Sequence, residues 1–142
     1  MTLLIDIIAG ARPNFMKIAP IIRALDQRMV EDGPLRYRLV HTGQHYDARM
    51  SGDFFTQLGI PDPHVNLEVG SGTQAEQTAA IMMRYEKLLI EAPSRLCLVV
   101  GDVTSTMACA IAAQVFGAST SRRPVSSPRH HDKLRPRHAG GP

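Results

Sequence analysis

Short apolar runs alternate along this chain with longer amphipathic segments, and this alternation restricts the possible folds more than any other feature. Runs rich in Ile, Val and Leu predict strands at residues 3–10, 36–42, 65–68 and 96–101. Helical periodicity predicts helices at residues 13–30, 45–57, 74–91 and 104–116. Strands that alternate with helices form parallel sheets with crossover helices. We therefore predict an α/β fold, a parallel sheet with flanking helices.

Charge is unevenly distributed and divides the chain into two parts. Residues 1–114 carry ten Lys and Arg against twelve Asp and Glu, whereas residues 115–142 carry six Lys and Arg against one Asp. The second part is also rich in Pro, Ser, Arg and His and has few large apolar side chains, so it cannot offset the entropy cost of ordering. We predict one domain over residues 1–114 and a basic, disordered tail over residues 115–142.

Several functional classes are disfavoured by composition. No apolar run approaches the roughly 20 residues of a membrane span, and the N-terminus lacks the pattern of a signal peptide, so we expect a cytoplasmic protein without a membrane partner. Cys97 and Cys109 lack metal-ligand spacing, which predicts buried thiols and no metal site. The basic tail has no interleaved aromatic residues, so we expect no specific nucleic-acid partner.

The turn after the first predicted strand combines a helix start with two cations. Gly10 relaxes the turn, and Pro13 suits the first position of a helix. The first-turn N–H groups and the positive end of the helix dipole then point beyond the strand. Arg12 could bind a phosphate bidentately, and Lys17 adds a point charge one turn later. The motif predicts a phosphate site; the alternative is two solvated cations at an ordinary helix start.

An acidic residue follows the last predicted strand. Asp102 comes directly after an apolar run that ends at Gly101. Ligands of open α/β sheets bind beyond the carboxyl ends of the strands, so we expect Asp102 and Arg12 to face one cleft. Asp102 is either a helix cap, a role that Thr104 or Ser105 could also fill, or a general acid or base above a bound ligand.

Two further loops follow predicted strands. Gln44 and His45 come after the second strand, where His45 would most simply open the next helix. Thr73 with Glu76 three residues later predicts a capping box for the helix at residues 74–91. The Gly70-Ser71-Gly72 segment before it could alternatively contact an anion.

Four motifs together resemble those of the non-hydrolysing uridine diphosphate (UDP) N-acetylglucosamine 2-epimerases. The family's G-T-R-P-E-x-x-K is matched at residues 10–17, its T-x-Q-H at 42–45, its G-x-G-x-x-x-x-Q-T at 70–78 and its G-D-x-x-[ST]-[ST] at 101–106. Order and spacing both fit, and the resemblance covers residues 3–114. Ala11 and Asn14 replace the commonest Thr and Glu of the first motif.

The resemblance implies two Rossmann-like domains with the substrate between them, a fold of the GT-B type, and this chain supplies most of the N-terminal one. It implies interconversion of UDP-N-acetylglucosamine and UDP-N-acetylmannosamine by elimination and re-addition of UDP, without a cofactor. Arg12 and Lys17 would bind the departing diphosphate, and Asp102 would belong to the acid–base set. Gln44 and His45 would lie near a second nucleotide-sugar site. Family members are expected to be homodimers.

The sequence departs from the family after the last helix. The family continues with H-V-E-A-G-L-R, then P-E-E-x-N-R and a second domain, and these motifs do not occur here. We therefore expect an incomplete N-terminal fragment with weak or no activity alone. We hypothesise a frameshift near residues 115–118, because codons chosen for residues 123–126 read Glu-Ala-Gly-Leu one base over. The alternatives are a hydrolysing 2-epimerase and a non-catalytic fragment that binds nucleotide sugars or polyanions.

Overall fold

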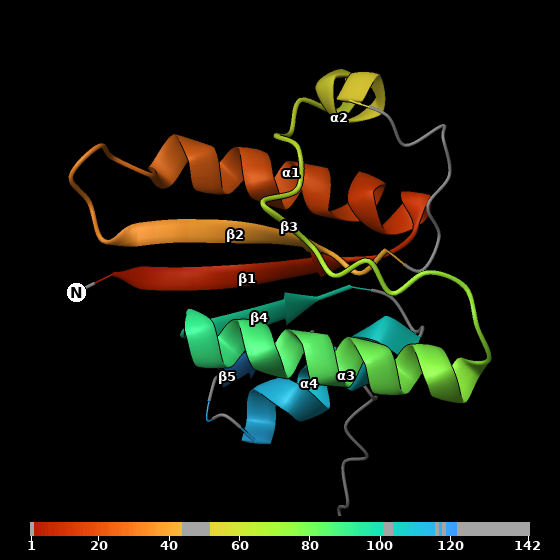
Figure 1. Cartoon of the computed structure of the whole chain (residues 1–142). Helices are drawn as coiled ribbons and strands as arrows, with labels where there is room; N and C mark the ends of the chain where they lie inside the picture. The colour runs from red at the N-terminus through yellow and green to blue at the C-terminus, as the bar shows by residue number, and fades with distance from the viewer. Residues whose placement is uncertain (1, 44–51, 101–103, 116, 118, 122–142) are drawn as a thin grey trace, which may run out of the picture.

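The predicted parallel α/β architecture is confirmed. The structure is a computed structural model that describes residues 2–43, 52–100, 104–115, 117 and 119–121. Its elements are β1 (Leu3–Ala9), α1 (Arg12–Arg28), β2 (Leu35–His41), α2 (Gly52–Leu58), β3 (Val65–Asn66), α3 (Gln74–Glu91), β4 (Leu96–Val99), α4 (Thr104–Val115) and β5 (Ser119–Ser121). The strands form one parallel sheet in the order β3-β2-β1-β4-β5 (Figure 1).

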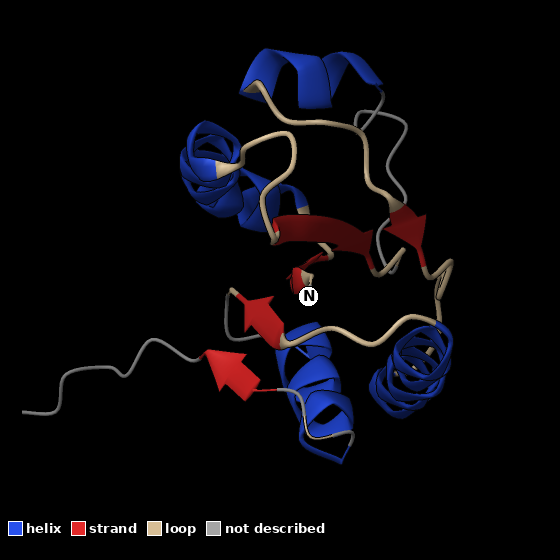
Figure 2. Cartoon of the chain, turned by 90° about the vertical axis from the view of Figure 1, so that its left-hand side faces the viewer, coloured by secondary structure: helices blue, strands red, loops and turns tan. Residues whose placement is uncertain are grey.

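Helices cover both faces of this sheet. Figure 2 shows α1 and α2 on one side and α3 and α4 on the other. Successive side chains of β1 point to opposite faces of the sheet, so β1 contributes to the core on both sides. Ile7 packs into the core under α1 and α2, and Ile8 packs into the core under α3 and α4. Within the described part of the chain, no helix is both long enough and apolar enough to cross a bilayer.

The tail prediction needs a correction at its start. Helix α4 ends at Val115, within one residue of its predicted end, but Ser119–Ser121 form strand β5 beside β4, although we expected a disordered tail over residues 115–142. A strand of three small polar residues has no local apolar signal, and it depends on main-chain pairing with Leu96–Leu98 of β4. Residues 122–142 lie outside the described residues, so the prediction for them stays a prediction.

A buried ion pair interrupts the apolar pattern of β1. Asp6 is fully buried and lies in register with Arg38 of β2. The Arg38 guanidinium donates from Nε and Nη2 to the two Asp6 carboxylate oxygens, at 2.6 and 2.8 Å. The Tyr85 hydroxyl of α3 donates to Asp6 Oδ2 at 2.8 Å, and Arg38 Nη2 also donates to the Ala92 carbonyl at 3.0 Å. These directional hydrogen bonds join β1, β2 and α3 and fix their relative positions more specifically than apolar packing alone would.

Both cysteines are buried, as the sequence predicts. Cys97 and Cys109 are buried free thiols in the core under α3 and α4. Burial raises the pKa of the Cys97 thiol to about 11 and raises that of Cys109 well above its usual range. Both side chains therefore stay protonated at neutral pH and act as small apolar residues.

The order of the strands reverses next to β1. The chain passes from β1 to β2 on one side, and it later crosses to β4 on the other side of β1. Because all strands are parallel, the β1–α1 turn and the end of β4 lie at the same edge of the sheet. This edge is the topological switch point, where open α/β sheets bind ligands.

Candidate functional site

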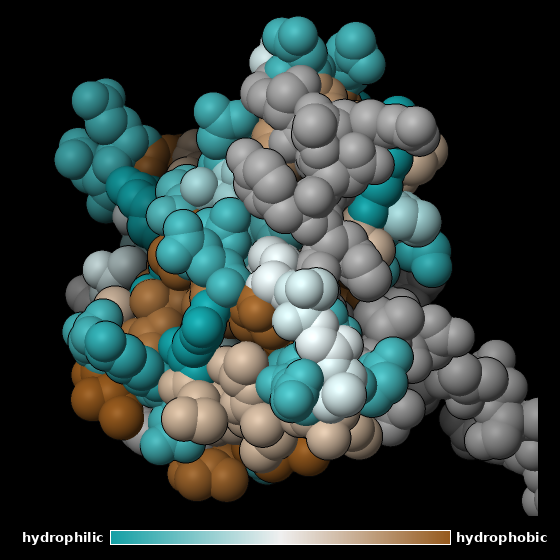
Figure 3. Space-filling model, turned by 45° about the vertical axis from the view of Figure 1, so that its right-hand side comes forward, coloured by the Kyte–Doolittle hydropathy of each residue, from teal (hydrophilic) through white to brown (hydrophobic). Residues whose placement is uncertain are grey.

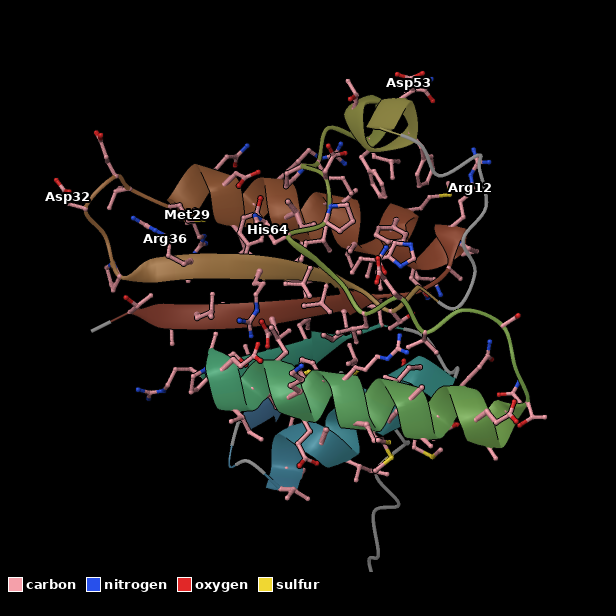
Figure 4. The ribbon with its side chains drawn as sticks, viewed as in Figure 1. Arg12, Met29, Asp32, Arg36, Asp53 and His64 are labelled. Carbon is pink, nitrogen blue, oxygen red and sulfur yellow. The ribbon has the colours of Figure 1, made fainter. Side chains whose placement is uncertain are left out.

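Arg12 lies at the switch point as the first residue of α1. Its exposed side chain extends from the start of α1 toward α2 (Figure 4). The guanidinium carbon lies 4.8 Å from the centroid of the Phe54 ring of α2. No hydrogen bond or ion pair joins the guanidinium to another residue that the structure describes. The side chain is thus placed by a ring face while its N–H donors stay available to an anion.

The Phe54 ring that contacts Arg12 belongs to a cluster of aromatic rings. Phe15 is fully buried and packs edge-on against Phe54 and Phe55, with ring centroids 6.4 and 5.1 Å apart. The His41 ring lies 5.1 Å from Phe15, at the end of β2. The four rings come from α1, α2 and β2, and they fix the positions of these elements around the carboxyl end of β1.

Asn14 connects the β1–α1 turn to the end of β4. Its Oδ1 accepts from the Ala11 backbone N–H at 3.0 Å, and its Nδ2 donates to the Val100 carbonyl at 3.4 Å. The Thr106 hydroxyl of α4 donates to the same carbonyl at 3.2 Å. The end of β4 is therefore tied to the first turn of α1 and to Thr106 of α4 through the Val100 carbonyl. Helix α1 begins at Arg12, so Pro13 occupies its second position rather than the predicted first.

Lys17 lies five residues after Arg12 on the exposed surface of α1. Five residues along an α-helix correspond to a rotation of about 140°, so the two side chains leave α1 in different directions. Lys17 is exposed and lies away from the helix face that buries Phe15 and Ile18. The geometry places Arg12 at the switch point, and the predicted contribution of Lys17 stays a prediction.

A hollow lies beyond the ends of β2 and β3. Gly43, Asn66, Glu68 and Gly70 line a cavity of about 390 Å³. Figure 3 turns this end of the molecule toward the viewer, and hydrophilic residues (teal) lie next to near-neutral residues (white) on this surface. Gly43 has φ 78°, and a Cβ at this position would lie 2.9 Å from the Glu68 Cα, so only glycine fits.

Side chains fix the loop around this cavity. Glu68 has φ 53°, a left-handed conformation that is unfavourable for a non-glycine residue. The Asn66 Oδ1 accepts from the Glu68 N–H at 2.9 Å, and the Arg84 guanidinium donates to the Leu67 and Glu68 carbonyls. The loop then leads into α3, a helix that occupies the predicted residues.

The predicted capping box of α3 is confirmed. Thr73 Oγ1 accepts from the Glu76 N–H at 3.1 Å, and Glu76 Oε2 accepts from the Thr73 N–H at 2.9 Å. Thr73 and Glu76 make these hydrogen bonds with each other, so the Gly70-Ser71-Gly72 segment leads directly into a capped helix. Its alternative role as an anion contact stays a prediction.

Three predicted site residues lie outside the described residues. These are Asp102, Gln44 and His45. The structure describes the residues next to them, which are Val100 and Thr104 around Asp102, and Gly43 before Gln44. Their roles therefore stay predictions.

Sequence reasoning missed the supporting residues of this site. Phe54 falls within the helix predicted at residues 45–57, where the pattern assigns it no role in the site, and it assigns none to His41 either. Asn14 was noted only as a departure from the family motif. A local signal existed for Asn14, because it stands at the third helical position, where a side chain can reach back to the preceding N–H. No local signal existed for Phe54, which contacts Arg12 from 42 positions along the chain.

His41 is buried in its neutral form, and this predicts acid sensitivity. Its Nδ1 accepts from the Gly43 N–H at 2.7 Å, and burial lowers its pKa below the usual 6.5. As pH falls below about 6.5, His41 takes up a proton in the unfolded chain before it does so in the folded chain. The free energy of unfolding therefore keeps its full value above this pH and decreases below it. We expect His41→Gln to reduce the loss of melting temperature between about pH 7.5 and about pH 5.5.

His64→Gln is the matched control for this prediction. His64 also accepts a backbone hydrogen bond through Nδ1, from Leu39 N–H at 2.9 Å, but its side chain is exposed. Thermal melts of the wild type and both variants at the two pH values provide the measurement. Equal acid sensitivity in the wild type and His41→Gln would contradict the assignment to His41.

The geometry first defines a class of protein. A parallel sheet with helices on both faces, and an arginine-bearing helix start at the switch point, form a Rossmann-like domain. Sequence comparison then identifies the family. The profile of the family described as UDP-N-acetylglucosamine 2-epimerase matches residues 27–120, and the chain belongs to this family.

Individual relatives support the same assignment. The chain is 38% identical over 109 residues to a UDP-N-acetylglucosamine 2-epimerase of Methanocaldococcus jannaschii, an alignment that covers 77% of this chain and 28% of the relative. It is 42% identical over 106 residues to the UDP-2,3-diacetamido-2,3-dideoxy-D-glucuronate 2-epimerase of Pseudomonas aeruginosa, which covers 75% and 29%.

Solved structures confirm the fold as the N-terminal part of a GT-B-type epimerase. The M. jannaschii epimerase in complex with UDP-N-acetylglucosamine and UDP matches with a TM-score of 0.75 and 35% identity, covering 83% of this chain and 31% of that protein. The epimerase from Rickettsia bellii matches with a TM-score of 0.70 and 28% identity, covering 84% and 30%. The chain thus spans less than a third of the length of these relatives.

Proposed function

We propose that this chain supplies the diphosphate-binding half of the active site of a UDP-N-acetylglucosamine 2-epimerase. The observation that carries the proposal is Arg12, which stands at the switch point beside the α1 N-terminus with its guanidinium donors available. Helix N-termini and arginine forks both favour phosphate groups. The complex of the M. jannaschii epimerase with UDP supports UDP as the ligand.

The proposed chemistry uses this charge as the reaction proceeds. Elimination of UDP from the sugar builds negative charge on the departing diphosphate, so a cation that binds this charge more tightly in the transition state lowers the barrier. We assign this role to Arg12, with Lys17 as an additional charge. Asp102 would act as an acid or base at the sugar, and Gln44 and His45 would contact a second nucleotide sugar. The assembled enzyme would work in the cytoplasm as a homodimer.

Calorimetric titration tests the proposal on the 142-residue chain. We expect saturable binding of UDP and of UDP-N-acetylglucosamine, and much weaker binding of uridine, which lacks the diphosphate. This comparison separates recognition of the phosphates from recognition of the base. Equal affinity for UDP and uridine, or no saturation with UDP, would contradict a diphosphate site at Arg12.

A second substrate has support from one relative. The P. aeruginosa protein, at 42% identity, is a 2-epimerase of UDP-2,3-diacetamido-2,3-dideoxy-D-glucuronate. Both substrates share the UDP group that Arg12 is proposed to bind. Product analysis with a full-length counterpart would distinguish them, and it would also distinguish epimerisation from hydrolysis, because only hydrolysis releases free sugar.

A further inference from the structure

We propose that Phe54 is a positioning residue for Arg12, and that its ring face sets the affinity of the site for the diphosphate. This inference rests on the proposed function, because it concerns the same arginine. It adds a residue of α2, which lies 42 positions along the chain from Arg12. The argument depends on the stacking geometry, on the anchoring of Phe54 and on the donors that stacking leaves available.

The contact has the geometry of a cation–π interaction. The Arg12 guanidinium carbon lies 4.8 Å from the centroid of the Phe54 ring, within the roughly 6 Å over which a ring face attracts a cation. Arg12 is exposed, whereas Phe54 is 6% exposed. An exposed arginine would otherwise sample many rotamers, so a fixed ring beside it reduces the entropy that the side chain loses when it binds an anion.

Phe54 is itself fixed by the core. Its ring packs against Phe15 at 6.4 Å with an interplanar angle of 84°, and against Phe55 at 5.6 Å. The end of α2 is joined to α1 through a hydrogen bond from Arg23 Nη1 to the Leu58 carbonyl, at 3.1 Å. Helix α2 therefore keeps its place relative to α1, and Arg12 rests on a rigid surface.

A ring suits this role better than an acidic partner would. A carboxylate would hold the guanidinium by accepting its N–H groups, and those groups would then have to exchange partners when a phosphate binds. The π face attracts the positive charge without accepting any of these hydrogen bonds. Asp53 precedes Phe54, yet its side chain points away from Arg12 at the outer side of α2 (Figure 4).

Phe54→Leu tests the inference, with Phe55→Leu as the matched control. Both phenylalanines belong to the same cluster, pack against Phe15 and are buried to a similar extent, at 6% and 5% exposure. Of the two, Phe54 is the one whose ring lies under the Arg12 guanidinium. We expect UDP affinity of the full chain to fall roughly two- to fivefold in Phe54→Leu, and to remain near the wild-type value in Phe55→Leu.

Two further variants separate stacking from a general loss of packing. Phe54→Trp keeps an aromatic face and should retain the wild-type affinity, while Phe54→Leu in an Arg12→Met background should have no additional effect. In the NMR spectrum, the Arg12 side-chain protons should lose their ring-current shift in Phe54→Leu but not in Phe55→Leu. This last signal does not depend on nucleotide binding.

The outcomes distinguish the two proposals. A loss specific to Phe54→Leu, rescued by Phe54→Trp, would support Phe54 as the positioning residue. Equal affinities of Phe54→Leu and the wild type, or equal losses in both leucine variants, would overturn this inference and leave the diphosphate site intact. If the wild-type chain binds no UDP, the proposed function fails, and the role of Phe54 in that site fails with it.

Discussion

Replacing Arg12 by alanine is expected to weaken binding of UDP by about 1.5–3 kcal/mol, or roughly ten- to a hundredfold in the dissociation constant. The reason is that its guanidinium is the cation that the structure places at the switch point, with its N–H donors available. Calorimetric titration of the wild-type and Arg12→Ala chains measures the change. The same variant should scarcely alter thermal stability, because the side chain is exposed.

Arg28→Ala controls for the change in net charge. Arg28 is an exposed residue at the opposite end of α1, so its removal lowers the charge of the chain equally without affecting the switch point. We expect its UDP affinity to stay close to that of the wild type. A similar loss of affinity in both variants would show that UDP responds to overall charge, and the site assigned to Arg12 would be wrong.

The largest effect on stability is expected for Asp6→Asn. This change preserves the volume of the side chain but leaves the buried Arg38 guanidinium without a charged partner. Breaking a buried pair in this way costs about 3–5 kcal/mol. Urea unfolding followed by circular dichroism measures the difference, and a loss of this size would unfold much of a chain of ordinary stability.

Two further variants test whether the stability loss in Asp6→Asn comes from breaking the buried ion pair. Asp62→Asn removes the same charge from an exposed loop position and should change stability by less than about 0.5 kcal/mol. The double variant Asp6→Leu with Arg38→Met removes both charges and should recover much of the stability lost in Asp6→Asn. If Asp6→Asn were no less stable than Asp62→Asn, the pair would not stabilise the sheet.

Local signals in the sequence were sufficient for several elements. Helix α3, Gln74–Glu91, begins at the predicted residue because the Thr73–Glu76 capping box is made of neighbouring residues. The apolar runs predicted β1 and β4 for a similar reason, since burial on both faces requires continuous apolar side chains. The family motifs indicated the epimerase family, because their order and spacing are properties of the chain itself.

Non-local contacts decided the remaining features. Ser119–Ser121 pair with β4 through main-chain groups, and Asp6 is paired with Arg38 and Tyr85 from other elements, so no local pattern predicts either arrangement. In the candidate site too, some features follow from the local sequence and others from non-local contacts. The sequence by itself determined that a cation stands at a helix start after a buried strand. Only the tertiary structure decided that Arg12 rests on Phe54, because the packing of α2 against α1 sets the position of the ring beside the guanidinium.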